Sequence, residues 1–162
     1  MPYPFRRPAN LKTLAPWALA AALGGGWLAR EAAIADEKAA PIASATINLD
    51  QVKMDDYSRP DGKRVGKIGV YLGGDTPAST KFVTGRLVLD AGQSPHAPHT
   101  HAEEEVMVIE SGTGEIVCDG KATKIGPGSV MYSTPNAPHG IVNTGATPIV
   151  FYFIKWAGKP SS

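Results

Sequence analysis

Beyond residue 45, the hydrophobic positions come in short runs that favour strands over helices. The runs are rich in β-branched residues and are separated by turn residues, and none has the 3.6-residue period of a convincing amphipathic helix. We therefore predict strands at residues 46–49, 67–72, 81–89, 105–109, 114–118, 121–125, 130–133, 140–143 and 149–156.

One hairpin is defined by its turn. The dipeptide Asp119-Gly120 separates two strand-like runs, and such a two-residue loop favours a type I′ turn, whose twist matches that of the flanking strands. Short strands without helices must close or stack, because an open sheet would leave its edges and one apolar face uncovered. The sequence thus predicts an all-β domain, a single small β-barrel or jelly roll, with room inside for one small ligand.

Composition narrows the class of protein. A chain of 162 residues with 43% hydrophobic content is one ordinary domain, and 18 glycines with 14 prolines suit strands joined by tight turns. The net charge of +1 gives no general attraction for nucleic acid or for an anionic membrane surface. Cys118 stands alone in the sequence, which excludes an intramolecular disulfide and a zinc site built on cysteines.

The first 35 residues have the order of a signal peptide. Basic residues up to Lys12 precede an apolar run at 14–29, and small residues at 33–35 offer a cleavage site. A second cleavage site follows Ala45, so residues 36–45 are interpreted as a flexible lead and residues 46–162 as the barrel domain. An uncleaved anchor is the alternative, but the apolar run is short of the roughly 20 residues that a span needs. We expect an exported protein, periplasmic or extracellular, with no stable membrane span after cleavage; Arg6-Arg7 is a weak match to a twin-arginine signal.

All four histidines lie between residues 96 and 139. In an extended chain, His99 and His101 share one parity with both Glu103 and Glu105, so these side chains could project to one face. Imidazole and carboxylate ligands together suit Fe(II), Mn, Ni, Cu or Zn. The pattern therefore predicts one divalent transition metal, and parity alone does not choose between the two glutamates.

These residues resemble the two motifs of the cupin superfamily, and the chain is similar to its small single-domain members over about residues 80–157. The first motif, G-x5-H-x-H-x3/4-E-x6-G, is matched by His99, His101, Glu105 and Gly112. The resemblance selects Glu105 over Glu103, because only Glu105 has the motif's spacing to Gly112.

The second motif, G-x5-P-x-G-x2-H-x3-N, is similar to the stretch from Gly128 through Pro135 and His139 to Asn143. The chain departs from the patterns only in loop lengths and in a missing glycine before His139. The resemblance implies that His99, His101, Glu105 and His139 bind the metal inside the barrel, and that Asn143 is a turn residue or supports a ligand. His96, which has the other parity and lies between two prolines, is interpreted as a loop residue at the barrel mouth.

The resemblance and the ligand set imply a metalloenzyme of dioxygenase type acting on a small organic substrate, with Glu105 as candidate catalytic base. The alternatives are a cupin isomerase or lyase that uses the metal as a Lewis acid, and a non-catalytic periplasmic module that binds a small molecule or metal. The resemblance also allows a homodimer. Four side chains on predicted strands could bind an anionic substrate, although such residues more often lie at a surface or rim: Arg86, Tyr132, Tyr152 and Lys155.

Overall fold

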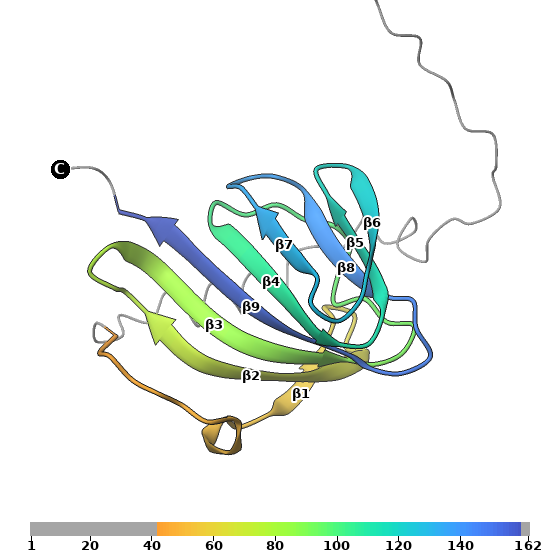
Figure 1. Cartoon of the computed structure of the whole chain (residues 1–162), viewed down its shortest axis with the longest axis horizontal. Coiled ribbons are helices and arrows are strands. Elements are labelled where there is room, and N and C mark those ends of the chain that lie inside the picture. Colours follow the sequence, from red (N-terminus) through yellow and green to blue (C-terminus); the bar gives the residue numbers. More distant parts are fainter. Residues whose placement is uncertain (1–41, 160–162) are drawn as a thin grey trace, which may run out of the picture.

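The computed structural model describes residues 42–159, which form two antiparallel sheets with one turn of 3-10 helix, η1 (Leu49–Gln51). Figure 1 shows the long strands β2, β3 and β9 running side by side, with the shorter strands gathered beside them. The strands are β1 (Asp55–Ser58), β2 (Arg64–Gly74), β3 (Ser79–Leu89), β4 (Glu104–Ser111), β5 (Gly114–Cys118), β6 (Lys121–Ile125), β7 (Val130–Ser133), β8 (His139–Asn143) and β9 (Ile149–Gly158).

The larger sheet has the order β1-β2-β3-β9-β4-β7. Its central strand β9 pairs with β3 on one side and with β4 on the other, so that Met107 lies opposite Phe153 and Ile109 lies opposite Phe151. Side chains opposite each other in an antiparallel pair share a face. These four are all buried, which places this face of the sheet towards the interior of the domain.

The smaller sheet has the order β6-β5-β8. Its hairpin pairs Cys118 with Lys121, and both turn residues have positive φ, 49° for Asp119 and 74° for Gly120. The predicted two-residue hairpin is thereby confirmed, since a type I′ turn requires positive φ at both central positions. Beyond β8, the backbone of His99 pairs with that of His139 as an isolated bridge, so that the segment before β4 runs along the edge of this sheet.

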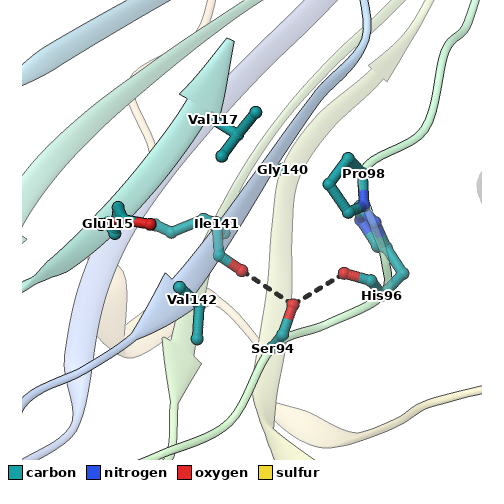
Figure 2. A pocket seen from close by; sticks show the side chains of 8 residues that line it. All are labelled: Ser94, His96, Pro98, Glu115, Val117, Gly140, Ile141 and Val142. Carbon is teal, nitrogen blue, oxygen red and sulfur yellow. Dashed lines mark hydrogen bonds between the residues drawn. The ribbon is translucent and has the colours of Figure 1, made fainter. Parts of the chain in front are cut away.

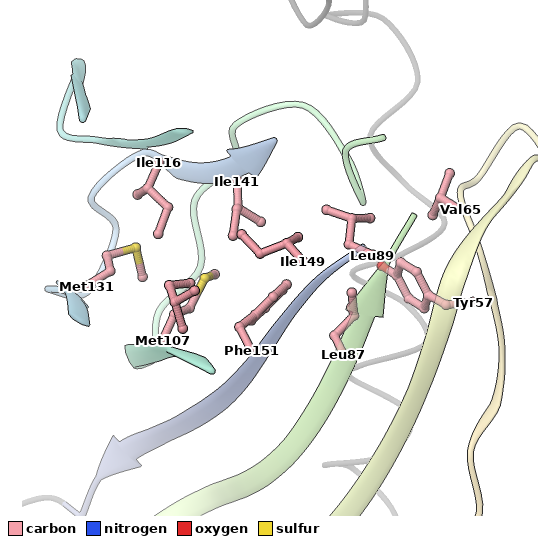
Figure 3. Packing of buried hydrophobic residues seen from close by; sticks show 11 residues of the cluster. Tyr57, Val65, Leu87, Leu89, Met107, Ile116, Met131, Ile141, Ile149 and Phe151 are labelled. Carbon is pink, nitrogen blue, oxygen red and sulfur yellow. The ribbon is translucent and has the colours of Figure 1, made fainter. Parts of the chain in front are cut away.

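The apolar core lies between the two sheets. Figure 3 shows Ile116 and Ile141 from the smaller sheet packed near Met107 and Phe151 from the larger sheet. Large side chains that are almost fully buried, such as Phe151, exclude water from this part of the interior. The all-β barrel fold predicted from the hydrophobic pattern is confirmed.

Eight of the predicted strands coincide with observed strands, and the differences lie near the start of the domain. The prediction of a strand at residues 46–49 is wrong, because Leu49 begins the 3-10 turn and the residues before it are irregular. The edge strand β1 was not predicted. Its sequence Asp-Asp-Tyr-Ser is polar, and Tyr57 is its one buried side chain. The sequence therefore shows no hydrophobic alternation from which this strand could be predicted.

The predicted signal peptide at residues 1–35, and most of the lead at 36–45, lie outside the described residues. Within residues 42–159, no helix has the length and apolar character needed to cross a membrane.

Two glycines with positive φ give a matched test of backbone packing. Gly92 has φ +70° and open space where a Cβ would stand, whereas a Cβ on Gly112 (φ +82°) would lie 2.6 Å from both Ile149 Cα and Pro148 O. We expect Gly92→Ala to cost about 1 kcal/mol, from the left-handed backbone alone. Gly112→Ala should cost about 2 kcal/mol more, because β9 must move away. Denaturant unfolding of both variants measures the difference, and equal losses would contradict the close packing of Gly112.

Candidate metal centre

Three histidines from two segments meet at the edge of the smaller sheet. His99 and His101 precede β4, and His139 begins β8. Two backbone hydrogen bonds join the segments: His99 N–H donates to His139 O (2.9 Å), and His139 N–H donates to His99 O (3.0 Å). As a result, one potential ligand atom from each of the three histidines lies within 4.8 Å of the others.

Glu105, on β4, brings a carboxylate to this cluster. The residue is only 4% exposed, and its Oε2 lies 2.8 Å from His101 Nε2 and 3.0 Å from His139 Nε2. Ser133, its partner across the β4–β7 ladder, is buried as well. A buried carboxylate is costly unless opposite charge or hydrogen bonds compensate for the lost water.

The other ring nitrogens fix how two of the histidines are protonated. His101 Nδ1 lies 3.0 Å from Glu103 O, and His139 Nδ1 lies 2.9 Å from Ala137 O. A backbone carbonyl only accepts, so each Nδ1 carries the hydrogen and donates it. In the neutral ring, Nε2 then presents a lone pair, and both lone pairs point at the same oxygen of Glu105.

Lone pairs cannot hydrogen-bond a carboxylate oxygen, so this arrangement requires a positive species between them: a proton on the ring nitrogens or a metal cation. The spacing suits a metal. Two ligands held about 2.1 Å from one ion at right angles are about 3 Å apart, which matches the observed separations of 2.8 and 3.0 Å. Three imidazoles and one carboxylate thus fit a divalent transition metal, with His101 and His139 already oriented by backbone carbonyls.

The electrostatic environment keeps the cluster ready for a cation. With a proton in place of the metal, burial would raise the pKa of Glu105, but the hydrogen bonds that it accepts from His101 and His139 outweigh burial and hold that pKa well below its ordinary value. Burial, together with the neighbouring histidines, lowers the pKa of His99 to about 2, so His99 is neutral and its lone pair is available to a metal. For His139, burial lowers the pKa, but the hydrogen bond to Glu105 prevails and the net shift is upward.

Comparison with known proteins agrees with this geometry. Residues 85–155 match the family model of the cupin domain, Cupin_2. An RmlC-like cupin from Shewanella frigidimarina superposes with a TM-score of 0.56 at 14% identity, over 73% of this chain and 95% of that one. The domain has the cupin fold. The family match and this neighbour together support the cupin superfamily.

Two other solved structures are similar to this chain in fold. One is described as a predicted oxalate decarboxylase from Thermotoga maritima (TM-score 0.57, 21% identity, 70% of this chain and 99% of that one). The other is KdgF from a Halomonas species (TM-score 0.56, 16% identity, 70% and 94%). At these identities the likeness shows the fold alone. None of the curated proteins compared with the chain matched it.

The structure separates the two glutamates that parity left equivalent. Glu103 lies in a bend before β4, where its carboxylate is 3.6 Å from Lys81 Nζ and 3.4 Å from His101 Nδ1, on the side of that ring away from Glu105. Glu105 is the carboxylate that meets the Nε2 atoms of the cluster. Glu103 therefore supports His101 from behind, chiefly through its backbone carbonyl.

His96 lies in the loop before His99, and its ring centroid is 4.0 Å from that of His99. Burial lowers the pKa of His96 to about 4, so the ring is neutral beside its neighbour. It is not a member of the three-histidine group. Asn143 is the last residue of β8, and its buried amide donates to Leu89 O at the end of β3 and to Thr147 O in the loop before β9.

The four residues considered for an anionic substrate separate into two groups. Arg86 pairs with Glu110 (3.0 Å), Tyr132 is 52% exposed and donates to Glu104, and Tyr152 lies opposite Arg86 on the outer face of the larger sheet. Lys155 is different, because it is only 6% exposed. The expectation that Lys155 is a surface or rim residue is wrong.

A small pocket lies between the loop at 94–98 and the strands β5 and β8 (Figure 2). Ser94 Oγ closes one side of it by donating to the backbone oxygens of Ile141 and His96. None of the residues lining this pocket belongs to the three-histidine group, but the lining residue His96 contacts His99, so the pocket adjoins the candidate metal centre.

Substitution of the ligands tests the metal centre. His101→Ala and His139→Ala should each lose most of the bound metal, and Glu105→Gln should weaken binding, because each removes a donor from the cluster. Glu103→Gln is the matched control: it keeps the backbone carbonyl that orients His101 and should bind metal within about threefold of the wild type. Metal content after dialysis, measured by element-resolved mass spectrometry, decides. Full occupancy in both histidine variants would rule out this ligand set.

Proposed function

We propose that this cupin is a metal-dependent enzyme of dioxygenase type, acting on a small organic substrate at a metal held by His99, His101, His139 and Glu105. The observation that supports it most directly is the convergence of His101 Nε2 and His139 Nε2 on one buried oxygen of Glu105. A module that binds a small molecule without metal would need no such concentration of donors in its interior.

A transition metal bound there would supply a redox centre at which O2 and a chelating substrate can bind side by side. The chain supplies the rest. Ser133 Oγ lies 3.1 Å from His139 Nδ1 and, with Ala137 O, fixes the plane of that ring. The apolar core beside the cluster limits access of water, which strengthens every electrostatic contact inside. In this proposal Glu105 is the base that would accept a substrate proton.

We further propose that the protein is exported and that it forms a homodimer through the outer face of the larger sheet. The supporting observation for the dimer is the exposure of apolar surface on that face, where Val130 is 66% and Tyr132 is 52% exposed. Both residues lie on the edge strand β7, and exposed apolar side chains at the edge of a sheet are a common feature of subunit contacts.

Oxygen consumption tests the enzymatic proposal. Protein purified from its own cell envelope without chelator should hold one equivalent of iron, copper, manganese or nickel. It should consume O2 with at least one member of a panel of small enols, thiols and acids, and His139→Ala should not. Stoichiometric metal without O2 uptake would favour the Lewis-acid isomerase or lyase, or a non-catalytic binder. Absence of metal, with none taken up on reconstitution, would refute the proposal.

The export proposal has its own test. Intact-mass analysis of the secreted or periplasmic protein should show Asp36 or Thr46 as the new N-terminus, because the two small-residue sites precede them. A chain that retains Met1 in the membrane fraction would contradict cleavage and indicate an anchor.

A further inference from the structure

Two residues with formally charged side chains are buried within residues 42–159, and they face each other. Glu105 is 4% and Lys155 is 6% exposed. The β4–β9 register places them directly opposite, and the β3–β9 register places Lys155 opposite the buried Val83. Directly opposed side chains share a face with Cβ atoms about 5 Å apart. Lys155 therefore points into the barrel beside the candidate metal centre.

The charge balance around Glu105 changes when a metal binds. Glu105 and Lys155 carry one charge of each sign, and without metal at most a proton on the histidine rings takes the place of the divalent ion. A divalent ion bound by neutral histidines and Glu105 gives the metal centre one net positive charge, and this charge lies beside the positive charge of Lys155. Uncompensated charge in an enclosed site is unfavourable, so the metal-loaded form demands an anion.

We propose that Lys155 is the anion-binding residue of the metal centre and that the substrate is a small dicarboxylate, one carboxylate on the metal and the other on Lys155. This inference rests on the proposed function, because it requires metal at His99, His101, His139 and Glu105. Two carboxylates balance the two charges.

The test compares an anionic and a neutral ligand on the Mn(II)-reconstituted full chain. Malonate is the dianionic probe, and imidazole, which coordinates metals without charge, is the neutral probe. Lys155→Met keeps the length and apolar stem of the side chain but removes its charge. We expect it to weaken malonate binding by roughly 10- to 100-fold, the range for a hydrogen bond to a charged group. Imidazole binding should change by less than about twofold, as measured by calorimetric titration.

Two further variants complete the experiment. Lys155→Arg keeps the charge and should retain more malonate affinity than Lys155→Met, and it also covers the case in which the methionine variant folds poorly. Lys124→Met, on the exposed strand β6, is the matched control and should bind malonate like the wild type.

Metal content distinguishes a failure of the proposed role of Lys155 from a failure of the proposed function. Lys155→Met should hold Mn(II) at least as tightly as the wild type, because a repelling charge has been removed. Unchanged malonate affinity, or equal losses for malonate and imidazole, would overturn the role of Lys155 while leaving the metal centre intact. A wild-type protein that binds no metal would instead overturn the proposed function, on which this inference depends.

Discussion

Burial of the Glu105 carboxylate is the constraint on which the rest of this site depends. A carboxylate removed from water must find compensation nearby, and here the compensation comes from two histidines belonging to different segments. The backbone bridge between His99 and His139 holds those segments together. The same contacts that make the burial tolerable thus create a cation site. For that reason the stability of this region and its affinity for metal cannot be varied independently.

The interior of the barrel changes from apolar to charged along single strands. On β4 the inward row runs from Ile109 through Met107 to Glu105, and on β9 it runs from Phe151 through Phe153 to Lys155. Each row begins in the apolar core and ends at the metal centre. The strands that form the core therefore also position the charged groups, and no separate loop has to hold them. Rigid placement of this kind lowers the cost of organising a ligand.

Much of this arrangement could be predicted from the sequence, and the failures have physical causes. The turn at Asp119-Gly120 and the adjoining strands follow from local chemistry. Parity could not separate Glu103 from Glu105, because the chain bends before β4 and the period of two is lost there. Strand β1 has no alternating pattern in its own sequence. It forms because it pairs with β2, and this partner cannot be predicted from the local sequence. The burial of Lys155 could have been predicted, because it has the same parity as the buried Phe151 and Phe153. The general tendency of lysines to lie at the surface was given more weight than this period of two.

Metal and anion binding at such a site must be coupled. In the metal-free site Glu105 compensates Lys155 and at most a proton takes the place of the metal, so the site attracts an anion less strongly. Bound metal adds positive charge beside Lys155. An anion that the metal helps to bind must, by thermodynamic reciprocity, raise the affinity for the metal by the same factor. A lysine next to a cation site lowers the affinity for metal when no anion is bound. The same lysine stabilises the complex in which metal and anion are both bound. Lys155 thus makes metal retention depend on the ligand, which a site with three histidines and Glu105 alone would do less strongly.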